Sequence, residues 1–356
     1  MPTFRSIILK TPSKTPREKT HLQKVLLAWY DHHARRFIWR EIHDSDSPPD
    51  PYVVLVSEVM LQQTQTARVQ EKLPLFLQMF PTVQALAAAD NATIIKAWEG
   101  MGYNSRALRL RDCARVVTER HNGSVPSTHD ELLALPGIGA YTASAILAFA
   151  YHKDVAVLDV NIRRVYSRLL APMPTTADVM DEKIVYDFAE SIYPRRKASR
   201  WHQAVMDIGA LFCTARAPKC GVCPLRELCA SAETMREQQK EKRPEPSWQG
   251  VPNRIWRGRI VQLLRGVDAR QSVTVSEITA QLFPATLFHN EESEQAEWLL
   301  KLLRDCLKSQ IMIEKSGQNP QIGGYEYHFL SLRPEYCPME YTRTIDRMQI
   351  LNGQAA

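Results

Sequence analysis

The 356-residue chain lacks the segments by which proteins enter or cross membranes. No apolar run approaches the roughly 18 residues that a membrane-spanning helix requires. The basic N-terminal stretch MPTFRSIILKTPSK also lacks the apolar core of about 7–15 residues that a signal peptide needs. We therefore expect no membrane partner and a cytoplasmic protein, associated with the nucleoid if the source is prokaryotic.

A strong excess of one charge sign is missing as well. Lys and Arg number 45 and Asp and Glu number 39, which leaves a formal net charge of +6. Hydrophobic residues at 44% and charged residues at 24% are typical of a globular protein rather than a disordered or fibrous one. The charge permits an anionic partner such as nucleic acid without requiring one, so it matters only where it gathers at a site.

Four of the seven cysteines lie together in the stretch CTARAPKCGVCPLRELC, which spans residues 213–229. In a reducing compartment, clustered cysteines are more often metal ligands or catalytic groups than disulfide partners. Structural zinc sites usually pair two short C-x2–4-C segments, whereas the spacing here, C-x6-C-x2-C-x5-C, has only one short interval. An iron–sulfur cluster tolerates uneven spacing because its ligands surround a larger object. The spacing favours a cluster and leaves zinc as the alternative; the scattered Cys113, Cys306 and Cys337 are interpreted as ordinary residues.

A second informative stretch, LPGIGAYTASAILAFA, covers residues 135–150. The segment before it opens with Ser127 and Thr128, which are candidate helix N-caps, and has apolar residues at helical spacing. Gly137 and Gly139 predict a tight turn between two helices, a helix-hairpin-helix. Their uncovered backbone N–H groups would lie at the positive end of the second helix and would bind phosphate without sequence preference. A plain helix turn with a glycine cap is the alternative.

Two carboxylates lie in apolar surroundings. Glu58 belongs to a predicted helix within DPYVVLVSEVMLQQTQTARV, and apolar neighbours would raise its pKa into the range of a general acid. The alternative is a solvated surface glutamate. Asp159 follows the apolar run 155–158, where it would cap a helix that begins near Asn161 or face a reacting centre.

The segments DPY, SEVMLQQTQ, WEGMGY, LPGIGAYTA and LDVN, followed by the four cysteines, occur in the order found in a known superfamily. Over about residues 22–230 the chain resembles the helix-hairpin-helix DNA glycosylases, which include endonuclease III, and it is most similar to the MutY-type adenine DNA glycosylases. The resemblance implies an all-α glycosylase fold over residues 1–230. It also implies a [4Fe–4S] cluster whose ligands would be Cys213, Cys220, Cys223 and Cys229.

The resemblance also implies a mechanism in which the target base is flipped out of double-stranded DNA that carries a mismatched or damaged base. Glu58 would protonate adenine N7 and help to activate water, and Asp159 would stabilise the positive charge that develops on the sugar. Tyr141 and Asn161 would lie near the scissile nucleotide. Because Tyr141 stands where endonuclease III has its Schiff-base lysine, the resemblance implies a monofunctional glycosylase with water as the nucleophile.

Further residues match the DNA-binding positions of the family. Two of them, Gln63 and Tyr103, would wedge into the vacated stack, and two basic residues of the cysteine loop would contact the phosphate backbone. The set that the resemblance implies is Gln63, Thr64, Tyr103, Arg106, Gly137, Gly139, Arg216 and Lys219.

Three departures from the family pattern qualify this interpretation. Asn104 replaces a second aromatic residue beside the wedge, and Val160 replaces the usual glycine, so a different shape is expected for the loop that bears Asp159. Tyr141 also occurs in thymine-mismatch glycosylases. The predicted function is hydrolysis of the N-glycosidic bond of adenine mispaired with guanine or 8-oxoguanine. The alternatives are a thymine or uracil mismatch glycosylase and a non-catalytic DNA-structure-binding protein, although retention of both acids favours an enzyme.

The chain after the cysteines does not match the NUDIX-like domain usual in the MutY type. Residues 231–253 are charged and predict a linker. Residues 254–335 predict three helices, the third from Ser293, followed by two strands within 311–332, which is the order of a winged helix. This small α+β domain favours a second DNA-binding module over a protein-contact domain as the alternative. Residues 336–356 predict a loosely held tail, and the protein is expected to be a monomer.

Overall fold

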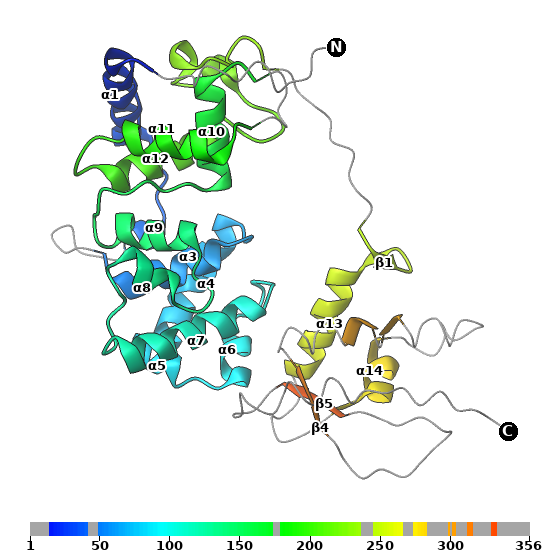
Figure 1. Ribbon diagram of the computed structural model, residues 1–356. Coiled ribbons are helices and arrows are strands. Elements are labelled where there is room, and N and C mark those ends of the chain that lie inside the picture. Colours follow the sequence, from blue (N-terminus) through cyan, green and yellow to red (C-terminus); the bar gives the residue numbers. More distant parts are fainter. Residues whose placement is uncertain are drawn as a thin grey trace. The chain divides into compact units, whose positions relative to one another are not determined.

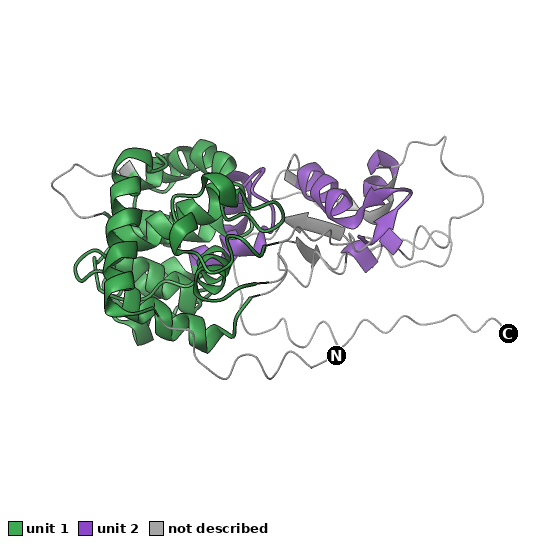
Figure 2. Ribbon diagram, turned by 90° about the horizontal axis from the view of Figure 1, so that it is seen from above, with its two compact units in different colours: residues 1–87, 112–244 green, residues 88–111, 245–356 purple. Residues whose placement is uncertain are grey.

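The computed structural model describes residues 14–41, 49–173, 179–235, 245–265, 273–282, 298–299, 301–303, 312–315 and 329–332. The chain forms two compact units (Figure 2). One comprises residues 1–87 and 112–244, and the other comprises residues 88–111 and 245–356. The division into domains at 230 and 254 stays a prediction, and the predicted tail lies outside the described residues.

The first unit is helical and has no strand among its described residues (Figure 1). Its helices and 3-10 turns are α1 (Pro16–His33), α2 (Ile38–Glu41), α3 (Pro51–Leu61), α4 (Thr66–Met79), α5 (Val83–Ala87), α8 (His129–Leu133), α9 (Ala140–Phe149), α10 (Val160–Leu170), α11 (Glu182–Ile192), α12 (Ala198–Leu211), η2 (Cys220–Val222) and η3 (Arg226–Leu228). Helix α7 (Ser105–Arg120) includes residues of both units. The predicted all-α glycosylase fold is confirmed. Within the described part of the chain, no helix is long and apolar enough to cross a membrane.

Packing of α3 against α9 supports the region of the predicted acids (Figure 1). Helix α3 begins at Pro51 because the Asp50 carboxylate accepts a hydrogen bond from the backbone N–H of Tyr52 at 2.8 Å. Most of α3 is buried, and at its C-terminal end the side-chain amide of Gln62 donates to the hydroxyl of Thr142 on α9 at 3.4 Å. Glu58 thereby becomes part of a tight helix–helix interface.

A second helix pair, α10 and α12, holds the segment that follows Asp159. Their interface contains a buried polar contact in which the indole N–H of Trp201 donates to the hydroxyl of Tyr166 at 2.7 Å. Because both groups are paired, their burial leaves no polar atom of the contact unsatisfied. This interface fixes the start of α10 relative to α12.

The predicted helix-hairpin-helix is confirmed as α8, a tight turn and α9. Thr128 caps α8 by accepting a hydrogen bond from the backbone N–H of Glu131. Gly137 has a φ of 79°, a left-handed conformation that glycine adopts without steric strain. Gly139 is the N-cap of α9.

The second unit contains α6 (Asn91–Ala97), α13 (Asn253–Arg265), α14 (Val275–Leu282) and two small antiparallel sheets. Strands β1 (Ser247–Trp248) and β2 (Val251–Pro252) form a hairpin in a segment that we expected to be linker. Strands β3 (Val273–Thr274), β4 (Met312–Lys315) and β5 (Phe329–Leu332) form a sheet in the order β3-β5-β4.

The element order of this unit bears on the winged-helix prediction. The β4–β5 pair confirms the predicted hairpin, and β3 is a strand that the sequence interpretation missed. Of the third predicted helix, residues 298–299 and 301–303 are helical, and its other residues lie outside the described part of the chain. The winged helix as a whole stays a prediction.

Candidate active site and metal centre

Glu58 lies on α3 with its side chain withdrawn from solvent, since the residue is only 6% exposed. Burial is the main cause that raises the pKa of its carboxyl group, the negative charge of Asp159 adds to the rise, and the resulting pKa is about 7. The hydroxyl of Tyr141 on α9 donates a hydrogen bond to Glu58 Oε2 at 2.8 Å, which opposes part of this rise. The alternative of a solvated surface glutamate is therefore wrong. A carboxyl group with this pKa is half protonated near neutral pH.

Asp159 takes the capping role that the sequence analysis gave as one of two alternatives. As the N-cap of α10, its Oδ1 accepts a hydrogen bond from the backbone N–H of Ile162 at 2.6 Å. Its Oδ2 accepts one from the side-chain amide of Asn161 at 2.8 Å. Burial raises the pKa of Asp159, while these hydrogen bonds and the charge of Arg164 lower it. The carboxylate is thus held in one orientation, and its charge reaches Glu58.

Val160 replaces the usual glycine of the family, and its position in the structure shows how valine is accommodated next to Asp159. Val160 is the first residue of α10 and has no left-handed φ, so a β-branched side chain causes no backbone strain there. Its side chain is 78% exposed beside Asp159.

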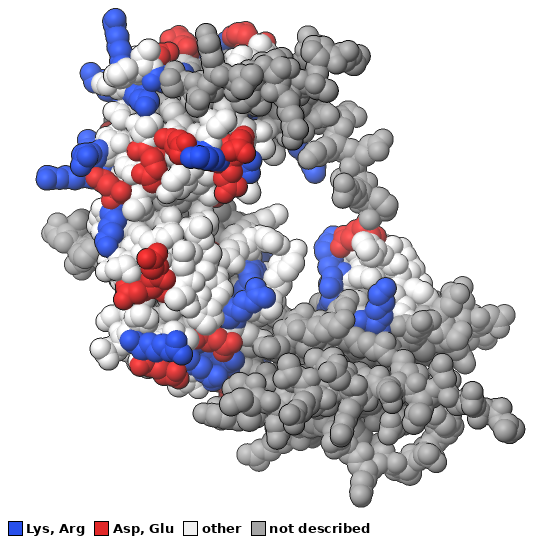
Figure 3. All heavy atoms as spheres, in the orientation of Figure 1, with Lys and Arg blue, Asp and Glu red and all other residues white. Residues whose placement is uncertain are grey.

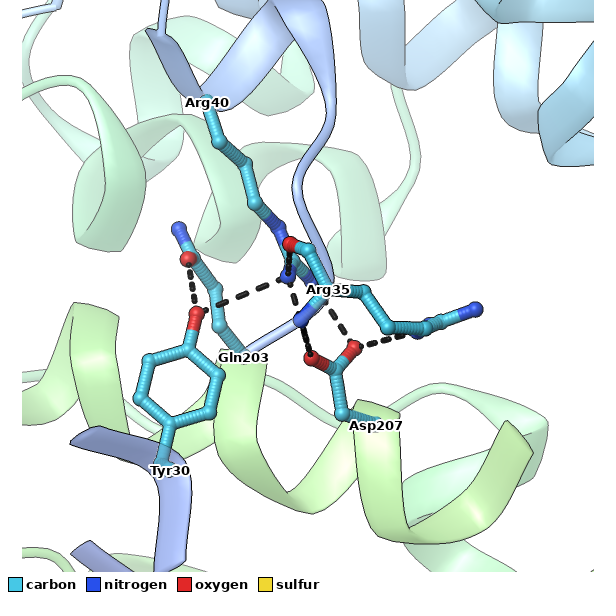
Figure 4. A network of polar contacts seen from close by, with 5 residues as sticks. All are labelled: Tyr30, Arg35, Arg40, Gln203 and Asp207. Atoms are coloured by element: carbon cyan, nitrogen blue, oxygen red, sulfur yellow. Dashed lines mark hydrogen bonds and ion pairs between the residues drawn. The ribbon is translucent and has the colours of Figure 1, made fainter. Parts of the chain in front are cut away.

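Arg35 and Arg40 form a clamp on the buried Asp207 (Figure 4). Asp207 on α12 has a fully buried side chain and accepts hydrogen bonds from Arg35 Nε at 2.8 Å and from Arg40 Nη1 at 3.2 Å. Arg40 also donates to the backbone carbonyl of Arg35 at 3.0 Å. Beside this clamp, the Tyr30 hydroxyl donates to Gln203 at 2.9 Å.

Arg40 of this clamp also affects the pKa of Glu58 on α3. The positive charge of Arg40 lowers the pKa of Glu58, but this effect is smaller than that of burial. Both oxygens of Asp207 accept hydrogen bonds from the Arg40 guanidinium, at 3.2 and 3.3 Å, and hold it in place. The sequence analysis missed both residues. The only signal was the basic and aromatic run RRFIWR, residues 35–40, in which nothing indicates a partner at position 207.

Arg164 connects the predicted catalytic segment to the cysteine loop. Its guanidinium donates to Asn161 Oδ1 at 2.9 Å, to the backbone carbonyl of Gly209 at 2.9 Å and to that of Cys213 at 2.7 Å. Gly209 makes room for this arrangement, because a Cβ atom there would lie 3.2 Å from Asn161 Cβ. A continuous chain of hydrogen bonds therefore runs from Asp159 to the first cysteine of the loop.

The cysteine loop brings its four thiols into one region of the chain. Burial is the main cause that raises the pKa of Cys223, the charges of Cys213, Cys229 and Cys220 add to the rise, and the resulting pKa is about 11. Among the described residues, no three His, Cys, Asp or Glu side chains form a group that could hold a single metal ion.

Cationic groups surround these thiols. The buried Arg168 donates to Cys213 Sγ at 3.4 Å, and its own backbone carbonyl accepts from Cys229 Sγ at 3.2 Å. Lys14 donates to the carbonyl of Leu228 at 2.8 Å, inside the loop. The four cysteines would hold a [4Fe–4S] cluster, whose iron–thiolate bonds would cross-link the loop. Positive charge suits the anionic thiolates that such a cluster requires.

The two predicted wedge residues are each presented by a strained backbone. Gln63 is exposed and has a φ of 55°. Tyr103 is 64% exposed and has a φ of 46°. Residues other than glycine seldom adopt such angles outside turns and functional sites. Thr64 lies beside Gln63 and is half-buried.

The other predicted DNA contacts differ in exposure. Gly139, Arg216 and Lys219 are exposed, and a Cβ at Gly139 would meet nothing within 4 Å. Arg106 is only 8% exposed, donates to the carbonyls of Met101 and Gly102 at 3.0 and 3.1 Å, and lies over the Tyr103 ring. Its geometry is that of a residue that shapes the loop bearing Tyr103.

Comparisons with known proteins agree with this arrangement. Residues 56–188 match the family model of the HhH-GPD superfamily base excision DNA repair proteins, and residues 213–229 match the iron–sulfur binding domain of endonuclease III. The adenine DNA glycosylase of Mycobacterium tuberculosis H37Rv is 38% identical over 266 residues, which cover 73% of this chain and 84% of that protein. Human adenine DNA glycosylase is 36% identical over 225 residues, 62% of this chain and 41% of the human protein. The structure of a thermostable thymine-DNA glycosylase matches with a TM-score of 0.54 and 28% identity, over 61% of this chain and 97% of that one.

The match of the cysteine loop to the iron–sulfur binding domain identifies the metal centre as a [4Fe–4S] cluster. We expect purified protein to be yellow-brown, to absorb broadly at about 400 nm and to contain roughly four irons per chain. Cys220→Ser should lower the iron content and the absorbance, whereas Cys113→Ser, outside the loop, should leave iron per folded chain unchanged. A colourless protein with one zinc per chain would contradict the assignment.

The raised pKa of Glu58 predicts a pH-dependent effect on stability. Glu58 stays protonated in the folded protein up to about pH 7 but ionises near 4.5 in the unfolded chain. Between these pH values the folded state binds the extra proton, so the stability contributed by protonated Glu58 is lost as pH rises through 7. We expect Glu58→Gln to raise the free energy of unfolding, relative to the parent, by roughly 2–3 kcal/mol more at pH 8 than at pH 4.5.

Urea denaturation at the two pH values measures this difference. Glu119→Gln, a matched change at an exposed position of α7, should show no such dependence. An equal effect of Glu58→Gln at both pH values would mean that the carboxyl group ionises normally.

Proposed function

The chain belongs to the adenine DNA glycosylase family of base excision repair, and from this premise we propose that Glu58 and Asp159 hydrolyse the N-glycosidic bond of adenine mispaired with guanine or 8-oxoguanine. The partner is double-stranded DNA that carries such a mispair, so the proposed place of action is the chromosome, in the cytoplasmic nucleoid of a prokaryote. A monomer suffices for this proposal, because both acids come from one chain.

The observation that carries the proposal is the buried carboxyl group of Glu58 with a pKa of about 7, hydrogen-bonded to Tyr141. A general acid is most effective when its pKa lies near the working pH. Once the adenine has been flipped out of the duplex, protonated Glu58 transfers its proton to N7 and makes the base a better leaving group. The resulting carboxylate then accepts a proton from the attacking water, which regenerates the acid.

Asp159 acts on the sugar. Bond cleavage leaves positive charge on the deoxyribose, and an ionised carboxylate nearby stabilises it. The hydrogen bonds from Ile162 and Asn161 favour the ionised form of Asp159 and fix its direction. Two carboxyl groups in unlike environments thus take the acid and the anionic roles.

Water is the proposed nucleophile because position 141 carries a tyrosine. Burial and the neighbouring carboxyl groups raise the pKa of Tyr141 well above its usual value, so the hydroxyl stays protonated and donates to Glu58. No amine is supplied at this position for a Schiff base, and the enzyme is accordingly monofunctional.

A second candidate function, excision of thymine or uracil opposite guanine, has one observation in its favour. The structural match with a thymine-DNA glycosylase covers 97% of that protein at 28% identity. The non-catalytic alternative is weaker, because a buried carboxyl group destabilises the fold at neutral pH and needs a functional reason.

Single-turnover cleavage of duplexes that contain A:8-oxoguanine, A:G, T:G or U:G separates these functions. The parent protein should release adenine, and Glu58→Gln should slow the release by about 100- to 10,000-fold, the usual contribution of a general acid. Glu119→Gln serves as the matched control and should act like the parent. Release of thymine or uracil alone would support the second candidate, and no release from any duplex would support a DNA-binding protein without catalysis.

A further inference from the structure

Helix α13 of the second unit separates an apolar side from a basic side. Its buried residues are Trp256, Ile260, Val261 and Leu264. Arg254, Arg257 and Gly258 are exposed and lie on one side of the helix, which we call the α13 basic face, whereas Arg259 is exposed on another side. The helix contains no acidic residue. Figure 3 shows basic side chains over this helix. A run of arginines on one helix face is an electrostatic footprint for an anionic partner.

Three tryptophans fix the basic face on a rigid base. Trp248 of β1 stacks on Trp298 with ring centroids 5.2 Å apart, and Trp256 of α13 meets Trp298 edge-on at 5.6 Å. The indole N–H of Trp256 donates to the Trp248 carbonyl at 3.2 Å, and that of Trp298 donates to Asn253 Oδ1 at 3.1 Å. The face is therefore presented by ordered structure, which lowers the entropic cost of binding a partner.

The β1–β2 hairpin, which carries Trp248, is closed by a two-residue turn. Gln249 and Gly250 both have a left-handed φ, 48° and 74°, as expected for a two-residue turn between antiparallel strands. Strands β1 and β2 thus belong to the same ordered body as α13.

The three arginines are available to a partner in different degrees. Arg254 forms an ion pair with Glu245 at 3.0 Å, but both side chains are largely exposed, and such pairs are weak. Arg259 lies over the Trp256 ring at 4.6 Å and projects about 160° away from Arg257 around the helix, so it does not belong to the α13 basic face. Arg257 is exposed, and no hydrogen bond or ion pair among the described residues engages it. Guanidinium groups bind phosphate through two parallel hydrogen bonds.

Gly258 is a further reason to expect that a partner can approach helix α13 closely. Glycine in the middle of an exposed helix is less favourable than alanine, and a Cβ atom here would meet nothing within 4 Å. Within the described part of the chain, no neighbour therefore requires glycine at this position. Gly258 lies one turn after Arg254 on the same side of the helix, and its lack of a side chain leaves the backbone there open to a partner.

We propose that the α13 basic face binds the phosphate backbone of DNA outside the lesion, as a second and sequence-independent contact. The proposal rests on the proposed function, because a glycosylase unit on the same chain keeps DNA at a high local concentration around this face. The phosphate backbone is the expected ligand because guanidinium groups bind phosphate through paired hydrogen bonds, and the helix has no acidic residue that would repel the backbone. It holds whether or not the remaining elements complete a winged helix.

The test measures the salt dependence of binding by the full chain to a fully paired duplex. Arg254→Gln/Arg257→Gln should lower the slope of log Kd against log salt by about 1.8, or about 0.9 for each lost phosphate contact. Between about 50 and 200 mM salt, the variant should therefore lose about 12-fold less affinity than the parent. Arg254→Lys/Arg257→Lys retains the charges and should keep most of the slope.

Lys24→Gln/Lys183→Gln is the matched control, since it removes two exposed cations of α1 and α11. A slope for the α13 variant equal to that of this control would overturn the proposal, and a partner for the face would then have to be an acidic protein surface. The rate of adenine release under saturating enzyme should be unchanged in both variants. If the parent releases no adenine at all, the proposed function fails, while the slope on paired DNA still decides the role of the α13 basic face.

Discussion

The active site depends on the burial of one carboxyl group, that of Glu58. Burial favours the protonated form of this carboxyl group, and Tyr141, Asp159 and Arg40 shift the equilibrium between the protonated and ionised forms. The packing of α3 on α9 removes water from the carboxyl group, and the Tyr141 hydroxyl donates a hydrogen bond to it without adding a charge. Arg40 opposes protonation, and Asp207 binds its guanidinium and holds it in place. A surface glutamate of the same helix would be ionised and useless as an acid.

The second acid depends on a different part of the fold. Asp159 is held by the first turn of α10, and Asn161 and Arg164 extend that support to the carbonyl of Cys213. The loop that contains Cys213 has only two short 3-10 turns and little core of its own. A [4Fe–4S] cluster held by the four cysteines would cross-link this loop and, through Arg164, would support the position of the proposed catalytic carboxylate of Asp159.

The sequence predicted the features that depend on local spacing. The turn at Gly137, the cap at Asp159 and the cysteine loop each follow from residues that are neighbours along the chain. Whether Glu58 was buried could not be decided locally, because its apolar neighbours fit a half-exposed helix equally well. The clamp of Arg35 and Arg40 on Asp207 was missed because it joins residues about 170 positions apart. The β1–β2 hairpin was missed because its two-residue strands are too short to show alternation, and Trp298, which stabilises it, lies far along the chain.

The most direct test of this account is a titration of the Glu58 carboxyl carbon by NMR in protein labelled with ¹³C in glutamate side chains, with the signal assigned by its loss in Glu58→Gln. The account predicts a midpoint at about pH 7 in the protein without DNA. A midpoint near the ordinary value of 4.5 would contradict it, because Glu58 would then be ionised at neutral pH and could not serve as the proton donor to adenine.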